Sequence, residues 1–492
     1  MTRQTPAIDP PPFEPPAPPL SGPGGFAGVA WVLILLGTIG AVAMQYIGVA
    51  GPDDGKDPIG LVMMKMQAQY VVGAAEFQGG GALLYGSVSK LNAGTIGQRQ
   101  RFVPLAGELI GPGEAADQTA DLDALIEQLV AGGELVLTEE QAAVQEIFHK
   151  LYPERDGEVA QLDALDDAER ALLVDQLGWF GELALAPPGT AGPVRDATLE
   201  SASKVFFIIL SVAGVIGLAG LAGFVGLVIV GVLALIGRVP SGMGAGLAPH
   251  GIYAETFAIW LPVFFGFQIV AGIIGSFLPG AMMLLAAIAF FLSLVVLAWP
   301  VLRGIPWADV RQDIGWHSGR QPLLEPIVGV ASYLMGLPIL AAGIGLTLVL
   351  IFVQAFFSGT PAPLAPTGGP AHPIILEVAG GSWAAHLQIL LVAAVAAPIV
   401  EETMFRGVLY RHLRDASSKL GIGLSILLST LLNAFVFAVI HPQGWVAIPA
   451  LMSLAIAFTL AREWRGTVMP SMLMHALNNA LVMTMLFGLF SV

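Results

Sequence analysis

The chain has 492 residues, of which 55% are hydrophobic and only 12% are charged. A typical soluble domain has about a quarter of its residues charged, so this composition excludes a conventional soluble enzyme. The absence of cysteine excludes disulfides, iron–sulfur clusters, cysteine-ligated zinc and a cysteine nucleophile. A formal net charge of −15 argues against a nucleic-acid partner, because such a partner requires a basic surface.

The charge is concentrated in one part of the chain. Residues 52–200 carry 25 acidic and 9 basic side chains, a net charge of −16, whereas the remainder has a net charge of +1. The sequence therefore predicts two environments, an acidic insert and a nearly neutral hydrophobic remainder.

The N-terminal part combines a proline-rich tail with a hydrophobic segment. Residues 1–25 contain a run of prolines and few hydrophobic anchors, a composition that favours polyproline II or disorder. Residues 26–50 are hydrophobic over a length sufficient to span a bilayer, for which about 20 residues are needed. We interpret them as an uncleaved transmembrane anchor, with signal-peptide cleavage near Ala50 as the alternative.

Eight further hydrophobic stretches bring the expected number of transmembrane helices to about nine, which predicts an all-α polytopic membrane protein. These stretches are residues 205–236, 253–275, 279–300, 326–356, 386–410, 421–441, 444–461 and 468–490. Placing the N-terminus in the cytoplasm makes the short loops with most Arg and Lys residues cytoplasmic, as the positive-inside rule requires. The acidic insert is then extracytoplasmic. We expect the protein in the cell (inner) membrane.

Residues 51–204 are expected to form a helical, acidic, extracytoplasmic insert. Thr138 and Gln141 form a capping-box pattern before a hydrophobic run, and residues 163–179 have hydrophobic residues at helical spacing. No catalytic constellation is evident in it, and we interpret His149 as a surface residue. The insert is a candidate surface for an extracytoplasmic partner. Residues 205–380 follow as transmembrane helices of unassigned role, and residues 381–492 hold the candidate catalytic residues.

The first candidate site is Glu401-Glu402, two adjacent carboxylates within a hydrophobic segment. Ionisable residues are costly in a membrane and usually face the interior of the bundle with a partner. Residues four apart share one face of a helix, so Arg406 can neutralise Glu402. Glu401 then points about 100° away around the helix. Pro398 removes one backbone hydrogen bond just before the pair and can open the helix locally. The alternative is a structural ion pair.

Two further sites follow in the last helices. Phe437 and His441 share one helical face, as do His475 and Asn479. Each site alone is interpreted more simply as a structural polar contact between membrane helices. If their polar faces converge with Glu401, however, the three helices enclose a carboxylate, two imidazoles and an amide.

Such a site has the groups that peptide hydrolysis requires. The reaction needs an activated water and a donor for the developing oxyanion. Glu401, His441 and His475 could equally hold a divalent metal such as zinc with an open fourth position. The usual His-Glu-x-x-His zinc motif is absent from the sequence, so the cofactor remains open between none and a divalent metal.

The motif set resembles the CAAX prenyl endopeptidase and bacteriocin-processing (CPBP, Abi) family of intramembrane proteases. The resemblance rests on Glu401-Glu402-x-x-x-Arg406, Phe437-x-x-x-His441 and His475-x-x-x-Asn479, in the family's order, and covers about residues 381–490. It implies that Glu401 activates water, that His441 assists it, and that His475 and Asn479 stabilise the oxyanion. Glu402, Arg406 and Phe437 would be supporting residues.

The function expected from the resemblance is an intramembrane endopeptidase, a CAAX-protease-like hydrolase. Its substrate would be a membrane-associated, possibly lipidated, protein or peptide in contact with the lipid bilayer. Two alternatives stay open on the sequence alone. One is a non-catalytic membrane scaffold or immunity-type protein, and the other is a proton-coupled transporter, since intramembrane Glu and His also build proton relays.

Overall fold

The computed structural model describes residues 26–47, 58–133, 135–153, 159–319, 321–358 and 382–490. These residues form helices joined by turns and loops, and no strand occurs among them. The all-α fold expected from the sequence is therefore confirmed. The proline-rich tail, residues 1–25, and most of the loop that precedes the candidate site lie outside the described residues.

Eight helical segments in the described ranges are long and apolar enough to cross a membrane, and residues Ala27–Ala43 of α1 (Ala27–Ile47) form a shorter apolar helix. Together they correspond to the expected spans. The eight are α9 (Pro193–Leu235), α10 (Ile252–Phe277), α11 with α12 (Met282–Ser293, Ala298–Leu302), α14 (Glu325–Ser358), α16 to α18 (Trp383–Leu391, Ala397–Glu401, Tyr410–Ala416), α19 (Ile422–Val439), α20 (Ile448–Arg465) and α21 (Met469–Phe490). The short α13 (Trp307–Ile314) lies in a loop of the bundle.

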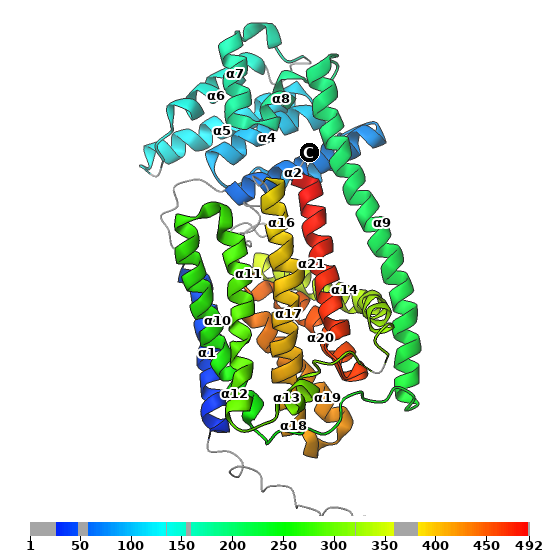
Figure 1. The fold of residues 1–492 in the computed structure, drawn as a ribbon. Helices are drawn as coiled ribbons and strands as arrows, with labels where there is room; N and C mark the ends of the chain where they lie inside the picture. The colour runs from blue at the N-terminus through cyan, green and yellow to red at the C-terminus, as the bar shows by residue number, and fades with distance from the viewer. Residues whose placement is uncertain are drawn as a thin grey trace, which may run out of the picture.

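The acidic insert is a small helical body at one end of the bundle (Figure 1). Its core is formed by hydrophobic residues such as Phe102, Leu105 and Phe148, which are at most 1% exposed. The expected capping box is present, because the Thr138 side chain accepts from Gln141 N and the Gln141 side chain accepts from Thr138 N. The insert helices are α2 (Pro58–Gln78), α3 (Ala82–Val88), α4 (Ile96–Leu109), α5 (Pro112–Ala131), α6 (Glu139–Leu151), α7 (Asp167–Leu177) and α8 (Trp179–Leu185).

Helix α9 joins the insert to the membrane bundle. It has 43 residues, which corresponds to about 64 Å, and it runs unbroken from the insert along the bundle (Figure 1). Position 204, where the sequence suggests the end of the insert, therefore lies inside a continuous helix. Helix α9 crosses α14 at Gly223, where a Cβ atom would lie 1.8 Å from Leu334 O. Only glycine permits this approach.

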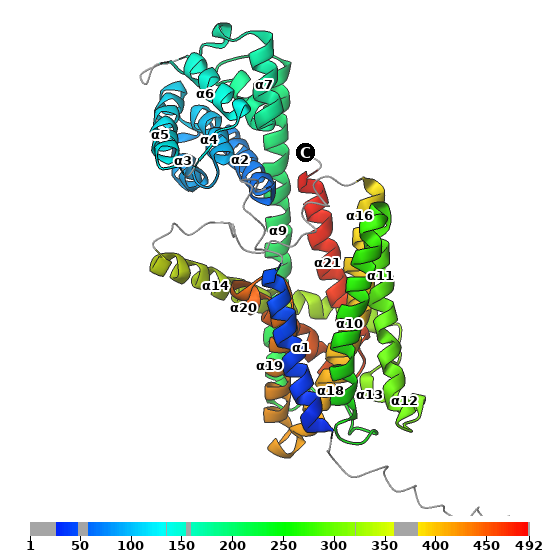
Figure 2. The same ribbon diagram turned by 90° about the vertical axis from the view of Figure 1, so that its left-hand side faces the viewer.

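A core of aromatic side chains fixes the helices around the candidate site. Phe405 packs edge-on against Phe257 and Trp260 of α10 and against Phe437 of α19. Helices α14 and α20 also pack along each other, and α14 crosses the bundle at a steep angle (Figure 2). The helices that carry Glu401, His441 and His475 are thereby packed into one unit.

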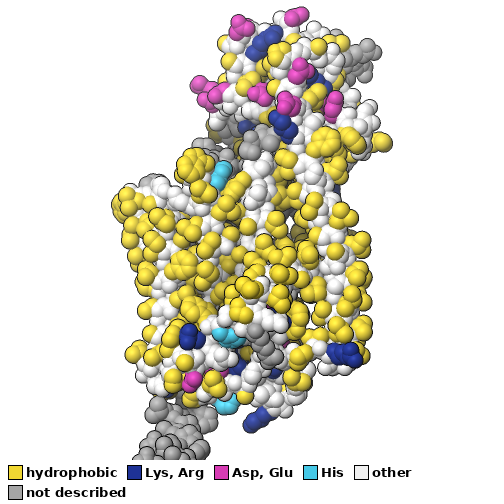
Figure 3. All heavy atoms as spheres, turned by 45° about the vertical axis from the view of Figure 1, so that its right-hand side comes forward, with side chains coloured by type: hydrophobic (Ala, Val, Ile, Leu, Met, Phe, Trp, Pro, Cys, Tyr) yellow, Lys and Arg dark blue, Asp and Glu magenta, His cyan; other side chains and the backbone are white. Residues whose placement is uncertain are grey.

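Lysine and arginine residues gather at the end of the bundle that is distant from the insert (Figure 3). Arg238 follows the C-terminal end of α9, and Arg411 and Arg414 lie in α18. The described loops with most basic residues thus share one end of the bundle, which is the arrangement that the positive-inside rule associates with the cytoplasmic face.

Candidate functional site

Glu401 lies in a helix whose hydrogen-bond pattern changes twice. Residues Val392–Ala396 and Glu402–Leu409 are π-helical, and the short α17 between them carries Pro398 and Glu401. Proline has no N–H to donate and its ring displaces the carbonyl four residues earlier, which gives a physical reason for the wider turn before it. Single π-helical turns within α-helices are frequent at functional sites.

Three of the four residues expected to be catalytic converge on one carboxylate oxygen. Glu401 Oε2 lies 3.6 Å from His441 Nε2 and 4.0 Å from His475 Nε2. The side chain of Glu401 is 13% exposed, that of His441 19% and that of His475 5%. Glu401 Oε2 is buried and has no hydrogen-bond partner among the protein atoms described. A buried carboxylate oxygen without a partner indicates a place for a water molecule or a substrate group.

Both imidazoles are oriented by hydrogen bonds at their Nδ1 atoms. His441 Nδ1 lies 2.6 Å from Phe437 O, and because a carbonyl oxygen can only accept, Nδ1 must carry the proton. His475 Nδ1 lies 3.0 Å from Glu402 Oε1, and an ionised carboxylate likewise only accepts. In the neutral imidazoles, Nε2 is therefore an acceptor that faces Glu401, so a bridging donor such as water is required between these groups.

Glu402 and Arg406 form the ion pair expected from their spacing. Arg406 Nη1 donates to Glu402 Oε1 over 2.9 Å, and both side chains are 0% exposed. The other terminal nitrogen, Nη2, donates to Ala455 O of α20. The guanidinium also lies 4.4 Å from the centroid of the Phe437 ring, a cation–π contact. The pair therefore links three helices and holds the carboxylate that orients His475.

Asn479 lies apart from the three converging residues in its described hydrogen bonds. Its Nδ2 donates to Ala393 O in the first π-helical turn, and its Oδ1 accepts from Asn478 Nδ2. Asn478 in turn lies 3.5 Å from the hydroxyl of Tyr333 on α14. In this structure the amide of Asn479 thus holds the backbone of the helix that carries Glu401.

The structure adds neighbours that the sequence reasoning missed. Phe458 of α20 stacks on His475 with ring centroids 5.2 Å apart, and Trp316 Nε1 donates to Thr403 Oγ1 beside the glutamates. Tyr333 approaches the site from α14. A hydrophobic residue in a hydrophobic helix carries no distinguishing sequence signal, so Phe458 could not have been found from the sequence. Tyr333 could have been, as a polar group within a span.

Glu401, His441 and His475, the residues that could hold a divalent metal, are not arranged as a metal site in this structure. Among the residues that the structure describes, no group of three or more His, Cys, Asp or Glu side chains is arranged to hold a metal ion. No chemical step is therefore assigned to a metal.

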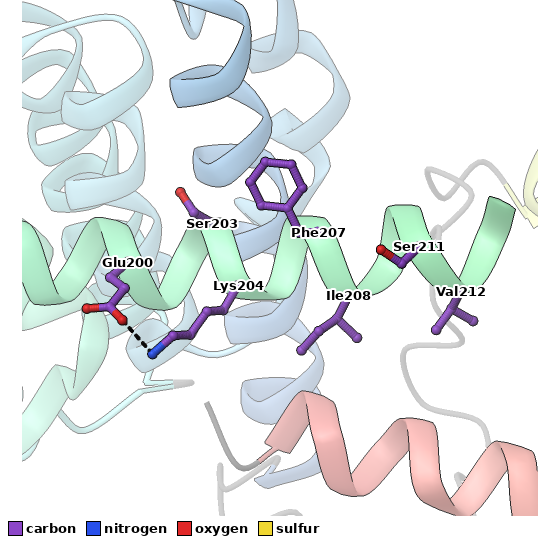
Figure 4. Close-up of a pocket in the computed structure, with 7 residues that line it drawn as sticks. All are labelled: Glu200, Ser203, Lys204, Phe207, Ile208, Ser211 and Val212. Carbon is purple, nitrogen blue, oxygen red and sulfur yellow. Dashed lines mark ion pairs between the residues drawn. The ribbon is translucent and has the colours of Figure 1, made fainter. Parts of the chain in front are cut away.

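A separate hollow lies near the insert, away from these residues. It has a volume of about 550 Å³ and is lined by one face of α9 between Glu200 and Val212 (Figure 4). Apart from the Glu200–Lys204 ion pair, its lining is mostly apolar. It contains none of the expected site residues, so it is not the candidate site.

Comparison with protein families agrees with the motifs. Residues 383–481 match the model of the family described as type II CAAX prenyl endopeptidase Rce1-like. This segment includes Glu401, His441, His475 and Asn479, so the resemblance expected from the sequence is confirmed. No curated protein and no solved structure gives a significant match. The chain is thus an integral membrane protein whose C-terminal helices are CAAX-protease-like at the level of the family.

Proposed function

We propose that this protein is an intramembrane endopeptidase that hydrolyses a peptide bond with a water molecule activated by Glu401. The observation that carries the proposal is the convergence of Glu401, His441 and His475 at distances of 3.6 and 4.0 Å. The substrate would be a membrane-associated, possibly lipidated, protein or peptide. The match of residues 383–481 to a family of endopeptidases supports the reaction class.

In the proposed reaction, the ionised Glu401 accepts a proton from a water molecule that also donates to His441 Nε2. The resulting hydroxide attacks the carbonyl carbon of the scissile bond and forms a tetrahedral intermediate with an oxyanion. The carbon–nitrogen bond then breaks, and the proton held by Glu401 passes to the leaving amine. Glu401 thus serves first as general base and then as general acid.

The imidazoles complete the site because their Nδ1 atoms are occupied. His441 is fixed by the carbonyl of Phe437, so its Nε2 can position the attacking water. His475 is fixed by the buried carboxylate of Glu402, and in the proposed reaction it acts with both ring nitrogens protonated. In that form Nε2–H is a donor for the oxyanion, the kind of stabilisation that is usually the largest contribution to such reactions. Asn479 is assigned a positioning role through Ala393.

The test compares wild type with Glu401→Gln and a matched control, Glu255→Gln. Glu255 is also 13% exposed and ion-paired in a membrane helix, but its partners are Arg303 and Trp299. Membranes from cells with equal expression of each variant are compared for the N-termini of all proteins by mass spectrometry. We expect a set of protein N-termini to be present with wild type and with Glu255→Gln and to be absent with Glu401→Gln. The same termini in all three samples would refute the protease and favour a scaffold.

A further inference from the structure

Helix α9 carries an uncharged stretch that is longer than the hydrocarbon core of a bilayer. No charged residue lies between Lys204 and Arg238, and the helical part of this stretch, residues 205–235, is about 46 Å long at about 1.5 Å per residue. The hydrocarbon core measures about 30 Å, and the bilayer with both headgroup regions about 40–45 Å. Because Arg238 follows the end of α9 that is distant from the insert, the other end of the stretch falls in the headgroup region on the insert side.

Aromatic side chains gather at this outer end of the stretch. Phe206 and Phe207 follow directly after Lys204. The Phe206 ring centroid lies 5.6 Å from that of Tyr70 and 5.6 Å from that of Phe77, both in α2, and Phe207 meets Phe77 edge-on at 5.9 Å. The rings cover one another only in part, since Phe77 is 65% exposed, Phe207 48% and Tyr70 37%. Interfacial helices bury Phe side chains between headgroups and acyl chains, and Tyr is enriched at the same level.

Helix α2 lies at the base of the insert. Figures 1 and 2 show it at the level where α16 and α21 end. It packs into the core of the insert through buried residues such as Val71 and Val72. Lys65 and Glu76 are its only charged residues, although residues 52–200 together have a net charge of −16. The acidic charge is therefore carried by other parts of the insert, and the base turns a nearly uncharged helix toward the level of the membrane surface.

The hollow beside α9 lies at the same level. Its volume is about 550 Å³, and its lining includes Lys204, Phe207, Ile208 and Val212 (Figure 4). Lys204 is nearest to the insert among these four, is 57% exposed and pairs with Glu200 at 2.7 Å. A cation on the water side and apolar side chains below it match a phospholipid, whose phosphate precedes its acyl chains. Lysine can extend its methylene groups along an apolar surface while its ammonium group reaches the phosphate.

We propose that the base of the insert binds the outer leaflet of the bilayer, with a phospholipid in the hollow beside α9. We name this surface, formed by Tyr70, Phe77, Phe207 and the lining of the hollow, the lipid-binding base. In water its side chains would form an exposed apolar patch, and such patches mark interaction sites. The patch continues into the exposed apolar residues of the membrane-spanning part of α9, such as Leu210 and Val215, which identifies the partner as lipid. The proposal goes beyond the proposed protease and does not depend on it.

Fluorescence quenching by labelled lipid tests the proposal, because the chain has no cysteine of its own. Tyr70→Cys and Gln78→Cys place an NBD fluorophore at the end of the insert that faces the membrane. Ala168→Cys places it on α7, on the side of the insert distant from the bundle (Figure 1). Gln78 and Ala168 are both exposed. Each full-length variant is reconstituted into phosphatidylcholine vesicles with and without phosphatidylcholine that carries a nitroxide quencher on its headgroup.

We expect the fluorophores at Tyr70→Cys and Gln78→Cys to lose most of their emission when the quencher is present, whereas Ala168→Cys keeps its emission. Equal quenching at all three positions would overturn the proposal, because the base would then be no closer to lipid than the rest of the insert. Ser211→Cys reports on the hollow itself, and absence of quenching there would remove the lipid from the hollow. Two base positions are used so that misfolding of one variant does not decide the result.

Substitution of the rings tests whether they hold the base in the lipid. Phe77→Ser combined with Phe207→Ser should weaken the quenching at Gln78→Cys. The control is Val136→Ser, which removes a side chain that is 91% exposed but lies outside the lipid-binding base, and which should leave the quenching unchanged. Equal quenching in the double variant and the control would show that the rings do not bind lipid.

The phospholipid in the hollow is measured separately, as phosphorus that stays bound per protein after purification in detergent. Lys204→Gln should lower this amount, because the phosphate loses its cation. The matched control is Lys150→Gln, which also removes a half-exposed lysine that is paired with a glutamate, but on α6 of the insert. Equal amounts of bound phosphorus in the two variants would contradict a phosphate contact at Lys204.

Discussion

The Glu402–Arg406 ion pair allows the energetic role of the site to be tested by a single substitution. Both side chains are 0% exposed and lie 2.9 Å apart. Replacing Arg406 by Met leaves Glu402 buried with no cationic partner except His475, and removing one member of a buried pair costs about 3–5 kcal/mol. We therefore expect Arg406→Met to lower the free energy of unfolding by about 3–5 kcal/mol.

The double variant Glu402→Gln with Arg406→Met separates the buried charge from lost packing. Replacement of a whole buried pair by neutral groups of similar volume is often close to neutral. We expect the double variant to recover at least about 2 kcal/mol of the loss, while proteolysis stays impaired because His475 has lost the carboxylate that orients it. Unfolding is followed by circular dichroism as SDS is titrated into detergent micelles.

Arg303→Met is the control for this experiment. Arg303 pairs with Glu255 but is 35% exposed, and exposed pairs contribute about 0–1 kcal/mol. The reasoning would be refuted if Arg303→Met and Arg406→Met lost equal free energy. It would also be refuted if the double variant were no more stable than Arg406→Met alone.

Three further outcomes are expected. Gly223→Val should separate α9 from α14 and destabilise the protein by about 1–3 kcal/mol, because its Cβ would overlap Leu334 O. The control is Gly231→Val, which should be neutral in the same unfolding assay because its Cβ would have no neighbour within 4 Å. Burial and the charge of Arg462 lower the pKa of His317, whose Nδ1 accepts from Gly319 N. Wild type should therefore lose stability as the pH falls below about 6.5, and His317→Asn should lose less over the same interval. Dialysis against a zinc chelator should leave proteolysis unchanged, since the described residues form no metal-holding group; loss of activity restored by zinc would contradict this.

Much of the fold follows from composition. Hydrophobic runs of about 20 residues mark membrane helices, and the spans expected from the sequence correspond to the helices found. The separation of Glu402 and Arg406 by four residues was enough to predict their ion pair. The connection between insert and bundle was harder to place, because α9 continues through the change in composition near residue 204. A helix has no reason to end where its environment changes from water to lipid.

The depth of the site could not be derived from span lengths alone. The helix Trp383–Ala416 has 34 residues, far more than the roughly 20 needed to cross the hydrocarbon core. Helix α19 has 18 residues and starts beside the end of that long helix, so His441 reaches the level of Glu401 instead of the far face. Local hydrophobicity does not encode this offset, which depends on how far α18 extends beyond the membrane.

The orientation of the imidazoles could not be predicted from the sequence either, and it gives Glu402 a second role. Spacing alone assigned Glu402 to Arg406, but the carboxylate also holds His475 Nδ1, so one oxygen serves both a structural pair and the proposed active site. A structural ion pair and a catalytic constellation are therefore not alternatives here. The pair fixes the carboxylate, the carboxylate fixes the imidazole, and the imidazole presents Nε2 to Glu401. This dependence predicts that Glu402→Gln reduces kcat while KM changes little, since the substitution disturbs a group that would act in the transition state.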